Sequence, residues 1–160
     1  MGKLHKLAYR VISTYWKIVF PTTVGIRCII TNHKGQVLLV RHSYRSGWYL
    51  PGGKLEKRET FEQGIRRELQ EELGISPETF TLFGAYNNFY EKNDSILLFE
   101  TQWEEIPKIS SGEIQEAGFF DFDHLPSPVS PGTMRRLTEW QQANNPAEVP
   151  EKKPPFVGMW

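Results

Sequence analysis

The spacing of apolar and polar residues changes several times along the chain. Over residues 1–20, apolar side chains recur at helical spacing with basic residues between them, which predicts an amphipathic helix. Runs rich in β-branched and other apolar residues predict extended segments over residues 22–31, 36–41, 80–86, 95–101 and 117–122. A further helix is expected from the capping box of Thr60 and Gln63 to about Leu73, and another over residues 132–142. The pattern therefore predicts strands with two helices among them, behind an N-terminal helix.

The length and the proline content suggest how the chain is divided. Its 160 residues suit a single domain, which we place at residues 21–143, between the helix over residues 1–20 and a proline-rich tail over residues 144–160. We expect the N-terminal helix to pack against the domain or against a second subunit, as in a homodimer. The alternative is a basic amphipathic helix that lies on a membrane surface.

Composition narrows the partners and the compartment. The 19 basic and 19 acidic residues balance, so the net charge does not point to nucleic acid as a partner. A single cysteine, Cys28, cannot form an internal disulfide, and no apolar run is long enough to cross a bilayer. A cytoplasmic location fits these features best.

The helix that follows Thr60 carries acids in an unusual place. A helical wheel gives it an apolar stripe and an opposite, solvated face; the stripe is Phe61, Ile65, Leu69 and Leu73, and the solvated face is Gln63, Arg66, Arg67 and Gln70. Glu68 and Glu72 fall at the edge of the stripe instead, one turn apart. There they repel each other, oppose the helix dipole and lose hydration. A hard divalent cation such as Mg²⁺ would relieve all three penalties. A solvated acidic helix paired with Arg66 and Arg67 is the alternative, which the wheel disfavours.

A motif around this helix resembles a known family. From Gly53 to Ile75 the chain reads GKLEKRETFEQGIRRELQEELGI, which is similar to the Nudix box at every fixed position: Gly53, Glu59, Arg67, Glu68, Leu69, Glu71, Glu72, Gly74 and Ile75. The resemblance covers Thr22 to about Leu137. It implies an α/β fold, a Nudix-type α/β/α sandwich with a mixed β-sheet, to which the N-terminal amphipathic helix is an addition. One departure is Gly64, where relatives commonly have alanine; close packing of a neighbouring loop or chance drift would explain it.

The resemblance also implies a metal site. Its ligands would be Glu68 and Glu72, with Glu71 as a further ligand or supporting acid, the carbonyl of Gly52, and Glu113 from a distant loop. Mg²⁺ is the expected cofactor, with Mn²⁺ as a substitute. For Glu113 the alternatives are Glu116 in the same loop, or an acid that is simply solvated.

The implied activity is metal-dependent hydrolysis of a phosphoanhydride bond in a nucleoside diphosphate derivative. Glu68 or Glu113 would be the general base, while Glu59 and Arg67 would form a structural pair that orients the acids. Nucleoside triphosphates, dinucleoside polyphosphates and ADP-ribose all stay open as substrates. A non-catalytic Nudix domain that senses a nucleotide or binds a protein is the alternative.

Candidates for substrate binding flank the box. Arg41, with His42 and Arg45, precedes the loop Pro51-Gly52-Gly53 and could contact phosphates, unless this segment is only a solvated loop. Trp48 and Tyr90 could stack on a base, although packing is the commoner role for such aromatic residues. We therefore expect a nucleotide-type partner bound near the loop.

Overall fold

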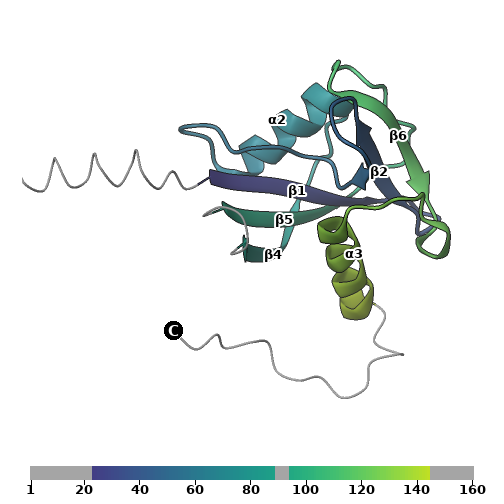
Figure 1. Ribbon diagram of the computed structural model, residues 1–160. Coiled ribbons are helices and arrows are strands. Elements are labelled where there is room, and N and C mark those ends of the chain that lie inside the picture. The colour runs from purple at the N-terminus through teal and green to yellow at the C-terminus, as the bar shows by residue number, and fades with distance from the viewer. Residues whose placement is uncertain (1–22, 89–93, 145–160) are drawn as a thin grey trace, which may run out of the picture.

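The computed structural model describes residues 23–88 and 94–144 (Figure 1). Its elements in chain order are β1 (Thr23–Thr31), β2 (Val37–His42), β3 (Trp48–Tyr49), α2 (Phe61–Leu73), β4 (Thr81–Asn88), β5 (Asp94–Gln102), β6 (Ile114–Phe120), the 3-10 turn η1 (Phe122–His124) and α3 (Pro131–Asn144). The predicted helix over residues 1–20, Tyr90 and residues 145–160 lie outside the described residues, so the domain boundaries stay a prediction. No helix in the described ranges is long and apolar enough to cross a membrane.

The strands form one mixed sheet in the order β3-β2-β1-β5-β4, with β6 paired to β2. The central strands β1 and β5 are parallel, in register from Thr23 opposite Asp94 to Thr31 opposite Gln102. The other pairs are antiparallel. Figure 1 shows α2 on one face of the sheet and α3 on the other. The α/β/α sandwich expected from the resemblance is therefore confirmed.

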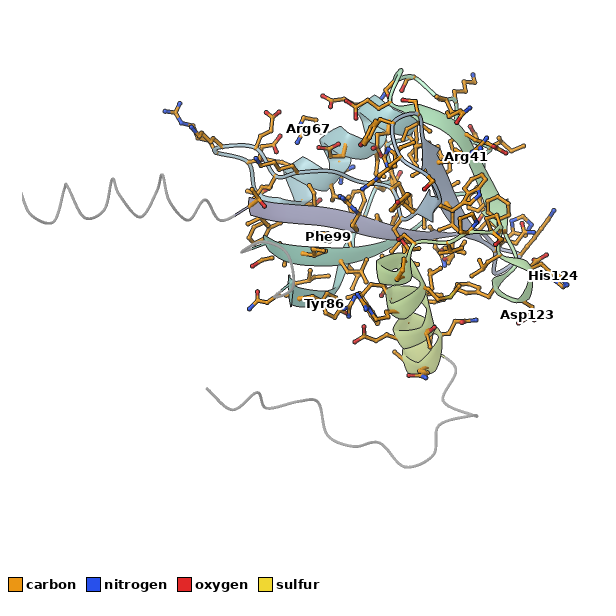
Figure 2. The ribbon with its side chains drawn as sticks, viewed as in Figure 1. Arg41, Arg67, Tyr86, Phe99, Asp123 and His124 are labelled. Atoms are coloured by element: carbon orange, nitrogen blue, oxygen red, sulfur yellow. The ribbon has the colours of Figure 1, made fainter. Side chains whose placement is uncertain are left out.

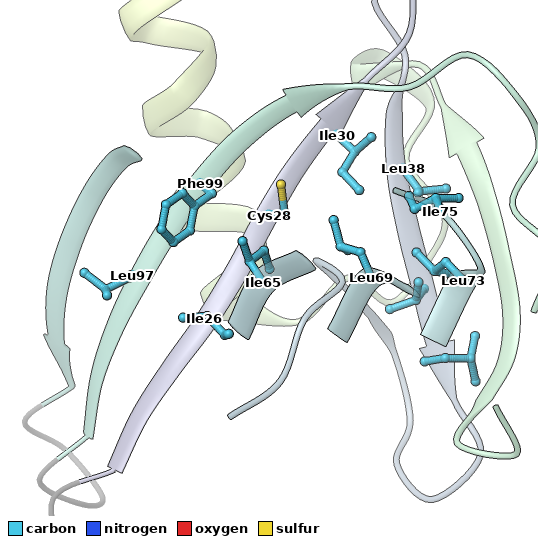
Figure 3. Close-up of a cluster of buried hydrophobic side chains, with 12 residues drawn as sticks. Ile26, Cys28, Ile30, Leu38, Ile65, Leu69, Leu73, Ile75, Leu97 and Phe99 are labelled. Carbon is cyan, nitrogen blue, oxygen red and sulfur yellow. The ribbon is translucent and has the colours of Figure 1, made fainter. Parts of the chain in front are cut away.

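Two apolar layers hold the helices to the sheet, because alternate residues of a strand point to opposite faces. The layer under α2 joins Ile26 and Cys28 of β1 to Ile65 and Leu69 of the helix (Figure 3). The layer under α3 is built from residues on the other face, among them Ile29, Leu98 and Leu137. Cys28 is fully buried, as expected of a small apolar side chain.

The ends of α2 agree with the sequence, but its apolar stripe does not begin where it was predicted. The capping box of Thr60 and Gln63 is present, and Gly74 ends the helix in the left-handed conformation with φ 65°. Phe61 was expected in the core and is 48% exposed, so that assignment is wrong. Gly64 makes the contact with the sheet instead: a Cβ atom there would lie 2.7 Å from Cδ1 of Ile26 and 2.8 Å from Cδ1 of Leu55. The glycine thus lets the helix approach β1 closely.

Candidate active site

The loop Pro51-Gly52-Gly53 is pinned against β1. The amide of Cys28 donates to the carbonyl of Pro51, and the amide of Ile26 donates to the carbonyl of Gly53, both at 3.0 Å. Gly52 has φ 120°, and a Cβ atom on it would lie 2.4 Å from the carbonyl oxygen of Ile26. Only glycine fits this position, because a side chain would meet both an unfavourable backbone conformation and a clash with the strand.

The two glycines also make room for two acids from α2. The amide of Gly52 donates to Oε2 of Glu72 at 3.0 Å, and the amide of Lys54 donates to Oε1 of Glu68 at 3.3 Å. A Cβ atom on Gly53 would lie 2.4 Å from Cδ of Glu68. The acids that the wheel placed at the edge of the apolar stripe therefore lie directly beneath the loop.

Glu72 is the most constrained of these acids. Its residue is only 6% exposed, and burial raises its pKa to about 7. The hydrogen bond from Gly52 acts in the opposite direction, the negative charge of Glu68 raises the pKa further, and the charge of Arg27 lowers it. A carboxylate in this position is only partly compensated by the protein, which is the environment in which a bound cation stabilises an acid most.

Arg67 holds the acids together, and the wheel was wrong to place it on a solvated face. Its guanidinium binds both carboxylate oxygens of Glu59, at 2.7 and 3.1 Å, and also contacts Glu68 at 3.0 Å and Glu71 at 3.2 Å. Only 23% of its side chain is exposed, because the long chain folds back along the helix and under the preceding loop. The helical wheel placed Arg67 away from the acids, and this prediction is wrong, because Arg67 is their partner.

Arg27 is a site residue that the sequence interpretation missed. It lies on β1, and its Nη1 donates to the carbonyls of Ile26 and Gly53, both at 2.7 Å. Burial lowers its pKa, while Glu72 and Glu68 raise it. The sequence did contain a signal, because Arg27 is the one charged residue in the apolar run TVGIRCII. A charge in a strand that is covered on both faces is costly unless it has a partner or a function.

The acids share a cleft of about 840 Å³ that residues of α3 also line. Glu68, Glu71, Glu72 and Glu113 all line it, so the loop acid predicted from a distant segment reaches the same space. Within residues 23–88 and 94–144, no three acid, histidine or cysteine side chains are arranged to hold an ion. The reason is visible in the contacts, since Glu68 and Glu71 turn toward Arg67. The oxygen donors nevertheless fit a hard divalent cation, because the side chain of Glu71 is 61% exposed and can reorient.

Two proposed substrate residues lie away from the cleft. Arg41, labelled in Figure 2, pairs with Glu116 at 2.7 Å across β2 and β6, and Glu116, the reserve for Glu113, does not line the cleft either. Trp48 is 7% exposed and packs edge-on against Phe120. Neither side chain lines the cleft, so these two assignments are not supported, and Tyr90 falls outside the described residues.

Other residues form the cleft walls. His42, Tyr44, Arg45 and Tyr49 line one side. Tyr86 of β4 and Arg136 of α3 line another, with the guanidinium 3.5 Å from the centre of the ring. The sequence pointed to His42 and Arg45 as phosphate contacts, but gave no sign of Tyr86 or Arg136, which come from elements distant in the chain.

The chain belongs to the NUDIX domain family, whose profile matches residues 21–141. It is 39% identical over 66 residues to a MutT-like protein of Streptomyces ambofaciens, covering 41% of this chain and 43% of the relative. It is also 39% identical over 70 residues to an RNA pyrophosphohydrolase of Aeromonas hydrophila, covering 44% and 39%. The matches thus span about two fifths of these curated relatives' length. The crystal structure of a MutT protein from Methanosarcina mazei Go1 superposes with TM-score 0.67 at 28% identity, covering 79% of this chain and 96% of that one.

Proposed function

We propose that this chain is a Nudix hydrolase that uses a divalent metal ion, Mg²⁺ or Mn²⁺, to cleave a phosphoanhydride bond in a nucleoside diphosphate derivative. The observation that carries the proposal is Glu72, a carboxylate 6% exposed at the floor of the cleft whose pKa burial raises to about 7. A structural acid would be expected at the surface or in a complete ion pair. Nudix hydrolases generally use divalent metal ions.

The ligands proposed for the ion are Glu68, Glu71, Glu72, Glu113 and the carbonyl of Gly52. Bound divalent ions would neutralise the phosphates and lower the pKa of a coordinated water. The hydrogen bonds of Arg67 to Glu59, Glu68 and Glu71 tie the loop before the helix to the acids. In this proposal Arg67 and Glu59 are positioning residues, since they orient the ligands without touching the reacting atoms.

Of the two candidates for the general base, we favour Glu113. The carboxylate of Glu68 already accepts hydrogen bonds from Arg67 and from the amide of Lys54. The carboxylate of Glu113 lines the cleft and has no hydrogen-bond partner among the described residues, so the oxygen that does not bind the ion can accept a proton. Glu68 then acts chiefly as a ligand.

The test is a panel of nucleoside triphosphates, dinucleoside polyphosphates and ADP-ribose, assayed for hydrolysis with Mg²⁺, with Mn²⁺ and with EDTA. We expect turnover of at least one compound with metal and none with EDTA. Glu68→Gln should lower that turnover by roughly 100-fold or more. Glu62→Gln is the matched control, because Glu62 is on the same helix but pairs with Arg66 at 3.0 Å. Tight binding of a nucleotide without hydrolysis across the panel would favour the non-catalytic alternative.

A further inference from the structure

Three guanidinium groups that line the cleft have no carboxylate partner among the described residues. Arg41, Arg66, Arg67 and Arg136 each form an ion pair of 2.7 to 3.2 Å. Arg27, Arg45 and Arg135 line the cleft, yet none of them has a carboxylate within 4.0 Å among the described residues. Of these, Arg27 and Arg45 lie close enough that the charge of Arg45 lowers the pKa of Arg27. Like charges placed together in a concave site are the arrangement expected where an anion binds between them.

Arg45 is held in place by neighbours that do not neutralise it. Its Nη2 lies 2.9 Å from Nε2 of His42, and its Cζ lies 3.8 Å from the centre of the Tyr49 ring. A guanidinium can only donate, so Nε2 of His42 must accept, and the imidazole is then neutral with its proton on Nδ1. His42 is 3% exposed and suited to this, since burial and the charge of Arg45 lower its pKa to about 4. Arg45 is therefore oriented but keeps its charge for a ligand.

Arg27 supports the other side of this space. One of its terminal nitrogens, Nη1, is used by the carbonyls of Ile26 and Gly53, and the rest of the guanidinium is without an acceptor in the described residues. The carbonyl of Gly53 belongs to the loop that covers Glu68 and Glu72, so Arg27 stands next to the acids, and Arg45 lines the same cleft. A phosphate bound between the two arginines would be covalently linked to a pyrophosphate held at those acids, as the next group of the same chain.

The charge of the whole lining points the same way. Six basic side chains and five glutamates line the cleft: Arg27, Arg45, Lys54, Arg67, Arg135 and Arg136 against Glu56, Glu68, Glu71, Glu72 and Glu113. Divalent ions at the acids would add further positive charge. A ligand with only two phosphates would leave the pair of arginines uncompensated, whereas a third phosphate would neutralise them.

We infer that Arg27 and Arg45, with His42 positioning Arg45, form a subsite for a phosphate group beyond the pyrophosphate held at the acids. This inference rests on the proposed function, which it sharpens: the substrate is a chain of three or more phosphates, as in a nucleoside triphosphate or a dinucleoside polyphosphate, in preference to ADP-ribose.

The test is a calorimetric titration of ATP and of ADP-ribose in the presence of Mg²⁺, on protein carrying Glu113→Gln, the favoured general base, so that neither nucleotide is hydrolysed during the titration. Adding Arg45→Gln should weaken ATP binding by roughly tenfold or more and change ADP-ribose binding by less than about twofold. Arg41→Gln is the matched control, because Arg41 is paired with Glu116 and lies outside the cleft. It should leave both affinities unchanged, and thermal unfolding of each variant checks that it is folded.

Equal losses for ATP and ADP-ribose, or no loss for either, would overturn the subsite. Because binding is measured without turnover, this outcome is separate from failure of the proposed hydrolysis. If Arg45→Gln retained both hydrolysis and the wild-type affinity for ATP, the subsite would be ruled out and the proposed hydrolysis would stand. His42→Phe, which removes the acceptor of Arg45, should raise the KM for ATP more than it lowers kcat if the imidazole acts by positioning.

Discussion

Among the described residues, two hollows are rich in glutamate, and their acids lie in different environments. The first is the cleft beside α2, with Glu68, Glu71 and Glu72. The second, of about 800 Å³, is bordered by β5, the segment that follows it and the end of α3, and its acids are Glu78, Glu100, Glu104 and Glu105. The cleft has five glutamates in its lining and the second hollow has four, so the number of carboxylates barely separates them.

The acids of the second hollow have hydrogen-bond partners, as Glu100 and Glu104 do, or are exposed, as Glu78 and Glu105 are. Glu100 accepts a hydrogen bond of 2.6 Å from Nε1 of Trp140. Glu104 has a side chain 51% exposed and accepts from both the amide and the ring of His33, which lowers its pKa. Burial instead raises the pKa of Glu72 in the cleft. The two pKa shifts have opposite directions, so neighbours stabilise the carboxylate of Glu104, whereas burial destabilises that of Glu72.

The largest expected effect comes from removing the buried charge in the cleft. Glu72→Gln keeps the shape of the side chain and an acceptor for the amide of Gly52, but loses a negative ligand. We expect kcat to fall by about 100-fold or more with the fold intact. Glu104→Gln, the same change in the second hollow, should leave kcat within about twofold. If the two variants kept equal activity in a steady-state assay, the contrast between the hollows would have no functional meaning.

The next effect concerns the space that glycine leaves for Glu68. In Gly53→Ala the new Cβ atom would lie 2.4 Å from Cδ of Glu68, so the carboxylate must move. A displacement of about 1 Å at a catalytic group is enough for a loss of up to 100-fold in kcat. Gly112→Ala is the control, because a Cβ atom on Gly112 has no atom within 4 Å. Wild-type kcat in Gly53→Ala would show that the position of Glu68 is not critical.

The stability of the metal-free protein should depend on pH through Glu72. Its pKa of about 7 in the folded protein lies above the value of 4.5 that applies when unfolded, so folding favours the protonated form. This contribution is complete below pH 4.5 and is lost as the pH rises through 7. Between pH 5.5 and 8 we expect a loss on the order of 2 kcal/mol, or several degrees in Tm.

Thermal unfolding with EDTA and with Mg²⁺ measures this effect. In the proposed site Mg²⁺ would bind the ionised carboxylate, so the gain in Tm from added Mg²⁺ should be larger at pH 8 than at pH 5.5. Glu72→Gln should flatten the dependence in EDTA, whereas Glu104→Gln should retain it. An identical slope in wild type and Glu72→Gln would assign the dependence to other groups.

Local sequence patterns predicted much of the fold and part of the site. The capping box, the left-handed Gly74 and the acids at the edge of the stripe are all properties of one helix, and a helical wheel describes them well. Arg67 and Phe61 show where the wheel fails. It gives the direction of each Cβ atom but neither the path of a long side chain nor the approach that Gly64 allows.

The residues of the cleft walls depend on strand pairing, which local patterns do not specify. Arg41 lies opposite Glu116 because β2 pairs with β6 in that register, and this neutralises the arginine that the sequence favoured as a substrate contact. Arg45, only four residues later, is past the end of β2 and lines the cleft. From the sequence alone the two were equivalent. The loop acid Glu113 could be predicted only through the family resemblance.

The smallest effect tests whether Arg67 orients the acids or only adds stability. Arg67→Lys keeps the positive charge but loses the paired hydrogen bonds to Glu59 and cannot hold Glu68 and Glu71 at the same time. We expect kcat to fall about tenfold, equivalent to about 1.4 kcal/mol, with KM changed much less. Arg66→Lys is the matched change one residue earlier, since Arg66 pairs with Glu62 and donates to the carbonyl of Pro77 outside the cleft. It should lower Tm by a few degrees at most and leave kcat unchanged. If both variants lost only Tm, Arg67 would be a stabilising residue like its neighbour, and the acids would hold their positions through the glycine loop alone.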